Sequence, residues 1–439
     1  MKEATDPTPM RLGYVVGTFP VVSTTFIARE LQTLRALGHS TTVVSLRRPP
    51  VHERAPDADV TGAPVSYLLP VSLGWLLRSH LTFALRRPGA YFGTLRWLLT
   101  RPHPSAGGRL RTGLHFGEGV AAAAVFEAAG VDLIHAHFVD RAATVALVVG
   151  RLLGLPYSVT AHANDIYRRP LLLEQKLGQA AFAVTVSDAN RRHLLEACPG
   201  LAPDRLHVIH GWVDPAAWRP SRDRSRAGPA RIVSVGRLVD KKGHADLIEA
   251  CAHLAAAGTA VECDIVGEGP LRARLEVHIE QAGLRGHVRL LGARSGSEVK
   301  ALLDDADLFV LACVVAPDGD RDGMPVALAE AMAMGLPVVS TELPGIDELV
   351  RPGTGILVPQ HDVRALAEAI DEIGKASPGA RAAMGRAGRA VVLESFVVAA
   401  GVDRRVTLFR AAIARSSAPS GNELEGDASG LAASAAGRR

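Results

Sequence analysis

The chain has 439 residues, 48% of them hydrophobic, and a formal net charge of +4 at pH 7. This length predicts two domains, each with a sizeable core, because one hydrophobic core rarely serves so long a chain. The small net charge gives no case for nucleic-acid binding, so we expect no nucleic-acid partner.

The four cysteines show neither CxxC nor other metal-ligand spacing, and nothing in their positions indicates a disulfide framework. We therefore expect a reducing compartment and a cytoplasmic location. The stretch from Met1 to Arg11 has mixed charges and no apolar signal region. No run reaches about 18 apolar residues, so a membrane-spanning helix is not expected.

Strand and helix patterns alternate along the first half of the chain, which is typical of an α/β domain. After a flexible N-terminus of residues 1–10, the first strand is expected over Arg11–Val16, followed by a loop at 17–20 and a helix over Thr24–Leu37. Further strands are predicted over Thr41–Leu46, Asp132–His135, Tyr157–Ala161, Ala183–Val186 and Leu206–Ile209. These elements predict an N-terminal domain over residues 11–213.

A segment without acidic residues interrupts this pattern. There is no Asp or Glu from Val60 to Gly117, and Trp, Leu and Arg recur at roughly helical spacing within residues 71–112. Basic amphipathic helices of this kind dock on anionic lipid, which favours peripheral contact with the inner face of the cell membrane. The alternative is a helical insert that packs on the N-terminal domain and keeps its arginines in water.

The second half begins after a Pro-, Arg- and Ser-rich linker at residues 214–229. Its strands are predicted over Ile232–Val235, Cys263–Val266, Val288–Leu291, Leu308–Leu311 and Pro337–Ser340. These elements predict a C-terminal domain over residues 230–390. The Ser-, Ala- and Gly-rich residues 416–439 are expected to be disordered.

Two basic side chains follow the first strand of this second domain. Arg237 stands at the carboxyl end of the strand, and Lys242 stands just before the helix expected over Ala245–Ala256. Ligands of open α/β sheets bind at that edge. Arg237 offers a planar fork to two phosphate oxygens and Lys242 offers a point charge. The alternative is a solvated charge cluster in a loop.

A second motif begins at Asp322 and runs into a helix. Pro325 suits the first turn of that helix, whose free N–H groups and positive dipole end form a site for a phosphate. Glu330, eight positions after Asp322, can chelate a diol such as a ribose. The two carboxylates and the helix start therefore predict a pocket for a sugar nucleotide, although an amphipathic helix after an ordinary loop is the alternative.

This segment resembles the Glu-x7-Glu motif of the retaining glycosyltransferases of family 4, with Asp322 in place of the first Glu. The Asp322 side chain is one methylene shorter than that of Glu. This difference leaves the class of enzyme unchanged and affects how the donor sugar is positioned. Residues 13–30, 132–138 and 160–167 resemble colanic-acid-type exopolysaccharide glycosyltransferases. The resemblance runs from about residue 11 to residue 410, nearly the whole expected fold.

The resemblance implies an α/β structure of the GT-B type, in which two Rossmann-like domains face a cleft and a C-terminal helix, here about 391–414, crosses back to the first domain. The N-terminal domain would bind the acceptor and the C-terminal domain the nucleotide sugar. The implied catalytic residues are His162, Arg237, Lys242 and Asp322. The implied donor-binding residues are Gly17, Gly236, Arg237, Lys242, Gly267, Leu291, Gly323, Met324, Pro325, Val326 and Glu330.

Several of these residues have a second interpretation. His162 follows a strand, where family members carry a His that contacts the donor sugar, or it is a buried His bonded to backbone. Asn164 and Asp165 hold the acceptor or cap the next helix. Gly17 permits close approach of a phosphate or sugar, or it is a plain turn residue. The spacing of His135 and His137 suggests a metal pair, but no third ligand stands at convincing spacing, so no metal site is predicted.

The resemblance implies a retaining transfer of a hexose-type sugar from a nucleotide sugar, with UDP favoured over GDP, to a glycan or lipid-linked polysaccharide intermediate. Front-face attack, with the leaving phosphate taking the acceptor's proton, needs no cofactor and no divalent metal. Three alternatives stay open: the same chemistry on a soluble secondary metabolite, a GT-B sugar-nucleotide epimerase, and a silent binding module. The sequence does not give the oligomeric state.

Overall fold

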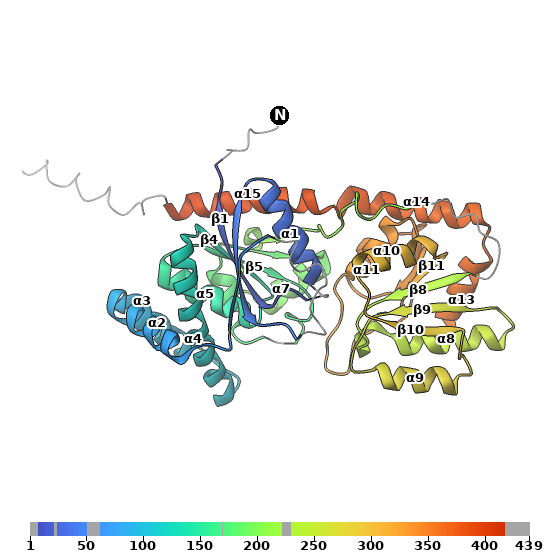
Figure 1. Ribbon diagram of the computed structural model, residues 1–439, viewed down its shortest axis with the longest axis horizontal. Coiled ribbons are helices and arrows are strands. Elements are labelled where there is room, and N and C mark those ends of the chain that lie inside the picture. The colour runs from blue at the N-terminus through green and yellow to red at the C-terminus, as the bar shows by residue number, and fades with distance from the viewer. Residues whose placement is uncertain (1–7, 22–23, 51–61, 169, 222–229, 418–439) are drawn as a thin grey trace, which may run out of the picture.

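The structure is a computed structural model that describes residues 8–21, 24–50, 62–168, 170–221 and 230–417 (Figure 1). It contains two sheets whose strand pairs are all parallel, and helices cover both sheets. The predicted α/β class and the two Rossmann-like domains are confirmed. Met10, expected in a flexible N-terminus, is buried, so the packed fold begins before residue 11.

The N-terminal sheet has seven strands in the order β3-β2-β1-β4-β5-β6-β7. Its strands are β1 Arg11–Thr18, β2 Ser40–Arg47, β3 Val65–Leu69, β4 Leu133–His137, β5 Tyr157–Ala161, β6 Phe182–Thr185 and β7 Leu206–Val208. The sequence analysis missed β3, a short edge strand that is mostly half-buried and therefore lacks a clear apolar pattern. The first strand also extends two residues beyond its predicted end, so Gly17 lies in a strand and not in a loop.

The helices of this domain pack on both faces of the sheet (Figure 1). They are α1 Thr25–Ala36, α2 Leu73–Arg86, α3 Pro88–Thr100, α4 Ala106–Ala129, α5 Arg141–Leu153, α6 Leu173–Gln179 and α7 Asp188–Ala197. Helices α4 and α5 approach closely, because a Cβ on Gly119 of α4 would overlap the side chain of Val148 on α5. Small residues on α4 therefore let the two backbones meet within the core.

The C-terminal sheet has six strands in the order β10-β9-β8-β11-β12-β13. Its strands are β8 Arg231–Val235, β9 Glu262–Val266, β10 Val288–Gly292, β11 Leu308–Leu311, β12 Val338–Thr341 and β13 Gly355–Val358. Its helices are α8 His244–Ala256, α9 Arg272–Gln281, α10 Gly296–Asp305, α11 Val326–Ala333, α12 Ile346–Leu349, α13 Val363–Lys375 and α14 Pro378–Ser395. The sequence analysis missed β13, a four-residue edge strand that follows a Gly-containing turn.

The C-terminal crossing consists of two helices instead of the single one predicted over about 391–414. Helix α14 packs against α11 and β13, and α15 (Val398–Ser417) packs against α1 and β4 of the N-terminal domain (Figure 1). The two helices separate at Phe396 and Val397, where the N–H groups of Trp212 and Val213 donate to the Phe396 carbonyl. The chain thus crosses between the domains twice at one place. Ser416 and Ser417, which were predicted to belong to the disordered tail, lie in α15 instead. The rest of the predicted tail, residues 418–439, lies outside the described residues.

Each sheet has one point where the strand order reverses, between β1 and β4 and between β8 and β11. Ligands of such sheets bind outside the carboxyl ends of the strands at that point. The loops at these edges meet across the domain boundary, since a Cβ on Gly323 would lie 3.1 Å from the Cβ of Ala163. The N–H groups of Asp188 and Ala189 also donate to the Glu348 carboxylate of the other domain. The fold therefore brings two ligand-binding edges together.

Candidate active site at the domain boundary

A buried charge cluster follows β8 and β11 at the reversal point of the C-terminal sheet. Lys242 Nζ lies 2.7 Å from Asp322 Oδ2, and Lys241 Nζ lies 3.5 Å from Asp322 Oδ1. Burial alone would raise the pKa of the Asp322 carboxyl, but the two ammonium groups outweigh it and lower the pKa to about 2. Asp322 is therefore ionised at neutral pH and holds Lys242 in place.

Arg237 lies in the turn after β8 and is exposed, and its guanidinium has no partner among the residues that the structure describes. The turn itself is tightly fixed, because a Cβ on Gly267 would overlap the carbonyl of Gly236. Gly267 N–H also donates to the carbonyl of Gly292, directly after Leu291, at 2.9 Å. The structure thus brings Gly236, Gly267 and the end of β10, which contains Leu291, together at the turn that carries Arg237.

Residues 323–326 lead into α11 beside this cluster. Pro325 directly precedes the helix instead of standing in its first turn, and its carbonyl accepts from the N–H of Leu328. The first N–H groups of α11, beginning with Val326, therefore remain available to an anion. Gly323 and Met324 are buried against the domain boundary, where any side chain at Gly323 would press on Ala163.

Glu330 on α11 already has a partner from the other domain. Its Oε1 accepts from Arg29 Nη2 on α1 at 2.7 Å, and Arg29 Nη1 donates to the Trp212 carbonyl at 2.8 Å. Burial raises the pKa of the Glu330 carboxyl, and the Arg29 guanidinium opposes that rise. Sequence reasoning missed Arg29, because the contact spans 301 positions and no local pattern signals it.

His162 lies at the end of β5 and is partly exposed. Its ring is held between those of Phe26 and Phe138, with centroid distances of 5.0 and 4.5 Å, and its Nε2 lies 3.3 Å from His137 Nδ1. Burial, followed by the nearby His137 and Arg405, lowers the pKa of His162 well below its ordinary value. The imidazole is therefore neutral at physiological pH.

The two residues expected to hold an acceptor face different ways. Asn164 is exposed, and Asp165 is buried. The Asp165 carboxylate accepts from the N–H groups of Val139 and His162 at 2.6 and 2.9 Å, and so fixes the ends of β4 and β5. Burial raises the pKa of Asp165 to about 7. Contact with an acceptor stays a prediction for both residues.

Gly17 lies at the end of β1, next to the reversal point of the N-terminal sheet. A Cβ added there would meet no heavy atom within 4 Å. The space beside it is therefore open, as a ligand would require, and its role in donor binding stays a prediction.

His135 and His137 on β4 do gain a third neighbour with ligand chemistry, Glu30 on α1, which the sequence spacing did not reveal. However, both ring nitrogens of His135 are used, by Ser158 Oγ at 2.8 Å and Thr160 Oγ1 at 3.0 Å. The guanidinium of Arg405 also lies 3.5 Å from Glu30. These contacts leave no lone pair on His135 and place a cation beside the carboxylate, so the cluster does not fit a metal ion.

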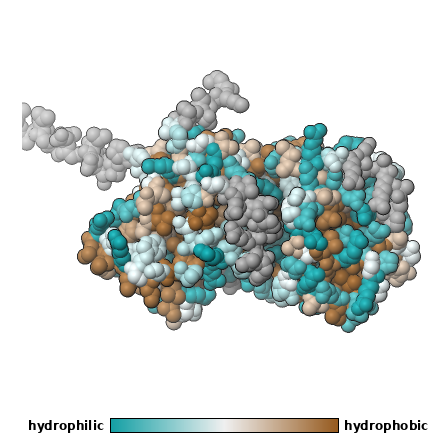
Figure 2. All heavy atoms as spheres, in the orientation of Figure 1, coloured by the Kyte–Doolittle hydropathy of each residue, from teal (hydrophilic) through white to brown (hydrophobic). Residues whose placement is uncertain are grey.

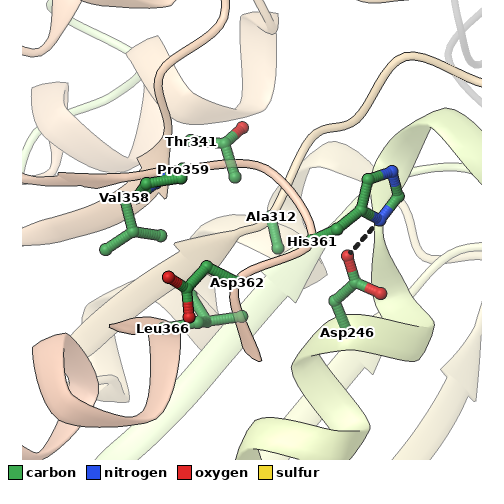
Figure 3. Close-up of a pocket in the computed structure, with 8 residues that line it drawn as sticks. All are labelled: Asp246, Ala312, Thr341, Val358, Pro359, His361, Asp362 and Leu366. Atoms are coloured by element: carbon green, nitrogen blue, oxygen red, sulfur yellow. Dashed lines mark hydrogen bonds and ion pairs between the residues drawn. The ribbon is translucent and has the colours of Figure 1, made fainter. Parts of the chain in front are cut away.

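A small hollow lies farther along the same edge of the C-terminal sheet, at the ends of β11, β12 and β13 (Figure 3). Thr341 and Val358 line it, and His361 bonds to Asp246 at its rim at 3.1 Å. It contains none of the predicted donor residues, and the cations described above follow β8. The candidate site is therefore the reversal point and not this hollow.

Two parallel-sheet domains that meet at their carboxyl edges, with cations beside a helix start, belong to the GT-B class of folds. Two family comparisons agree with that class: residues 23–217 match Glycosyltransferase Family 4, and residues 220–391 match Glycosyl transferases group 1. The putative colanic acid biosynthesis glycosyltransferase WcaL of Escherichia coli (strain K12) is 32% identical over 373 residues, covering 82% of this chain and 89% of that protein.

The amylovoran biosynthesis glycosyltransferase AmsK of Erwinia amylovora is also 32% identical, over 82% of this chain and 89% of its own length. The chain therefore belongs to glycosyltransferase family 4. Among solved structures, Anabaena HepE in complex with UDP and glucose superposes with a TM-score of 0.69 at 18% identity, over 92% of this chain and 100% of that one. This likeness confirms the GT-B fold.

Proposed function

We propose that this glycosyltransferase moves a hexose-type sugar, with retention of configuration, from a UDP-sugar to a hydroxyl of a glycan or lipid-linked polysaccharide intermediate. The observation that carries the proposal is the convergence of Arg237, Lys242 and the start of α11 at the β8/β11 reversal point. Relatives named for colanic acid and amylovoran biosynthesis, and a neighbour solved with UDP and glucose, support the choice of substrates.

In this proposal the departing diphosphate meets fixed positive charge. Arg237 contributes an exposed guanidinium, and Lys242 contributes an ammonium group that Asp322 orients. Fixed electrostatics of this kind is usually the largest catalytic term, and loss of one such donor costs about a hundredfold in rate. The same cations would take the place of a divalent metal, so transfer should continue in the presence of EDTA.

Calorimetry with UDP and GDP, without added metal, tests the donor site. Arg237→Ala should lose most of the affinity for UDP, and Arg274→Ala, an exposed arginine on α9, should keep it. Folded wild type that binds neither nucleotide would refute the donor site.

The stereochemistry of the reaction tests retention. The product from an α-linked UDP-hexose should be α-linked by NMR, and a β-linked product would refute retention.

We also propose that the enzyme works on an anionic membrane surface through α2, α3 and α4. In the described part of the chain, eight of the eleven exposed large hydrophobic residues belong to this group, and Figure 2 shows brown side chains where these helices lie in Figure 1. They are Leu73, Trp75, Leu77, Leu81, Leu85, Phe92, Leu110 and Leu114. The exposed arginines of the same group are Arg78, Arg86, Arg96, Arg109 and Arg111.

The four exposed leucines of α2 recur every fourth residue, so they form one stripe along the exposed side, opposite the buried Ser79 and Phe83. A stripe of apolar side chains beside arginines, without acidic residues, matches the boundary of an anionic bilayer. No helix in the described ranges is long and apolar enough to cross a membrane, so the proposed contact is peripheral.

Sedimentation with phosphatidylglycerol-containing vesicles tests this surface. Leu81→Glu should reduce the bound fraction, whereas Val277→Glu, at an exposed hydrophobic position on α9, should not. Binding of wild type to neutral vesicles alone, or equal binding by both variants, would refute the proposal. A concentration-dependent dimer that Leu81→Glu abolishes, without vesicle binding by wild type, would assign the stripe to a second copy of the chain instead.

A further inference from the structure

A buried ion pair lies inside the N-terminal domain, beneath His162. Glu30 on α1 is 3% exposed and Arg405 on α15 is 2% exposed. Arg405 Nη1 lies 3.5 Å from Glu30 Oε2, and Tyr14 Oη donates to Glu30 Oε1 at 2.7 Å. Burial alone would raise the pKa of the Glu30 carboxyl, but the Arg405 guanidinium opposes that rise and keeps the carboxyl ionised.

A contribution to folding stability is a weak explanation for the buried ion pair between Glu30 and Arg405. Removing two charges from water costs several kcal/mol per ion, and buried pairs often contribute no net stability over apolar residues of similar volume. The pair does have one consequence for its surroundings, because Glu30 Oε2 also lies 3.6 Å from Nε2 of His137. A fixed negative charge is thus directed at one ring nitrogen of that histidine.

His137 passes this charge on to His162. An ionised carboxylate favours the proton of a neutral imidazole on the nitrogen that faces it, here His137 Nε2. In a neutral His137 with its proton on Nε2, Nδ1 is left to accept from His162 Nε2–H, and the two atoms lie 3.3 Å apart. The remaining nitrogen of His162, Nδ1, would then carry no proton, and it makes no hydrogen bond with any residue in the described ranges.

We propose that Glu30 and His137 are positioning residues that fix His162 in the tautomer with a bare Nδ1, so that it presents a hydrogen-bond acceptor to a sugar hydroxyl. This inference rests on the proposed function, in which His162 contacts the donor sugar. Arg405 holds the Glu30 charge, and the rings of Phe26 and Phe138 hold the imidazole plane. The hydrogen-bond acceptor, His162 Nδ1, is therefore oriented before the substrate binds.

The four residues Glu30, His137, His162 and Arg405, called the relay below, come from four different parts of the fold. Glu30 is on α1, His137 on β4, His162 follows β5 and Arg405 is on α15, so each link depends on the packed domain. Helix α15 is the half of the C-terminal crossing that packs on the N-terminal domain, and it contributes a charge beneath His162 as well as apolar contacts to the core.

The tautomer can be measured without turnover, by multiple-bond ¹H–¹⁵N NMR on protein labelled at histidine nitrogens. Loss of one signal set in His162→Gln identifies His162. We expect the His162 proton on Nε2 in wild type; a proton on Nδ1 would overturn the proposal. Because this reading needs no substrate, inactive wild type with the expected tautomer would refute the proposed function and leave the relay intact.

Kinetics then test whether the relay positions His162. Glu30→Gln should change the His162 signals and lower kcat/KM about tenfold, the usual effect of misplacing one hydrogen bond. The matched control is Glu118→Gln, which removes another Glu–Arg pair of the same domain, with Arg141, and should change neither. If Glu30→Gln does not fold, His137→Gln replaces it. A folded relay variant with the wild-type tautomer and kcat/KM would overturn the proposal.

Discussion

The pairing of Asp322 with Lys242 predicts a pH-dependent stability that a single substitution removes. In the folded protein the pKa of Asp322 is about 2, and an unfolded aspartate has a pKa of about 3.9. A lowered carboxyl pKa stabilises the fold above the unfolded value, and this contribution is lost as the pH falls through the folded value. The shift corresponds to about 2–3 kcal/mol at pH 7 and to about half of that at pH 3.

Asp322→Asn should therefore unfold more easily than wild type by about 2–3 kcal/mol at pH 7, and this difference should shrink as the pH falls from about 4 towards 2. Urea unfolding of both proteins at pH 7, 4 and 3 measures it. Asp403→Asn, at an exposed carboxylate on α15, is the control and should stay within about 0.5 kcal/mol of wild type. Equal stability of wild type and Asp322→Asn at pH 7, or a difference that does not change with pH, would refute the reasoning.

The domain boundary gives two further predictions. Arg29→Ala leaves the buried Glu330 without its partner, so we expect a loss of about 3 kcal/mol in urea unfolding, and no loss would show that the ion pair contributes nothing. Gly323→Val places a side chain against Ala163 and should separate the domains. Small-angle scattering should then show a larger radius of gyration with unchanged circular dichroism, whereas an unchanged radius would mean that the boundary has room for the side chain.

Local sequence patterns were sufficient for most of the fold. The strand at Leu308–Leu311 was predicted with the bounds that the structure gives, because a buried parallel strand is a short apolar run. The edge strands β3 and β13 were missed because they are only partly buried. The division of the crossing helix at Phe396 carries no Pro or Gly signal, and it coincides with hydrogen bonds to Trp212 and Val213, which lie far away in the sequence.

The candidate site shows the same limit. Arg237, Lys242 and Asp322 follow strands of one sheet, so their approach could be predicted from the rule that ligands bind at the carboxyl edge. Arg29 and Glu30 could not be identified in this way, because α1 reads as an ordinary amphipathic helix. Their partners, Glu330 and Arg405, come from the other end of the chain, and only the packed structure reveals them.

The crossing at Phe396 has a consequence for protein engineering. Helix α15 packs on α1 and β4 and supplies the partner of Glu30, although it follows the whole C-terminal domain in the sequence. A chimera that exchanges the N-terminal half between relatives by a single junction at residues 214–229 would combine one parent's α1 with the other parent's α15. Two junctions, at that linker and at Val397, keep the exchanged half intact, and a library built with both should contain more folded proteins.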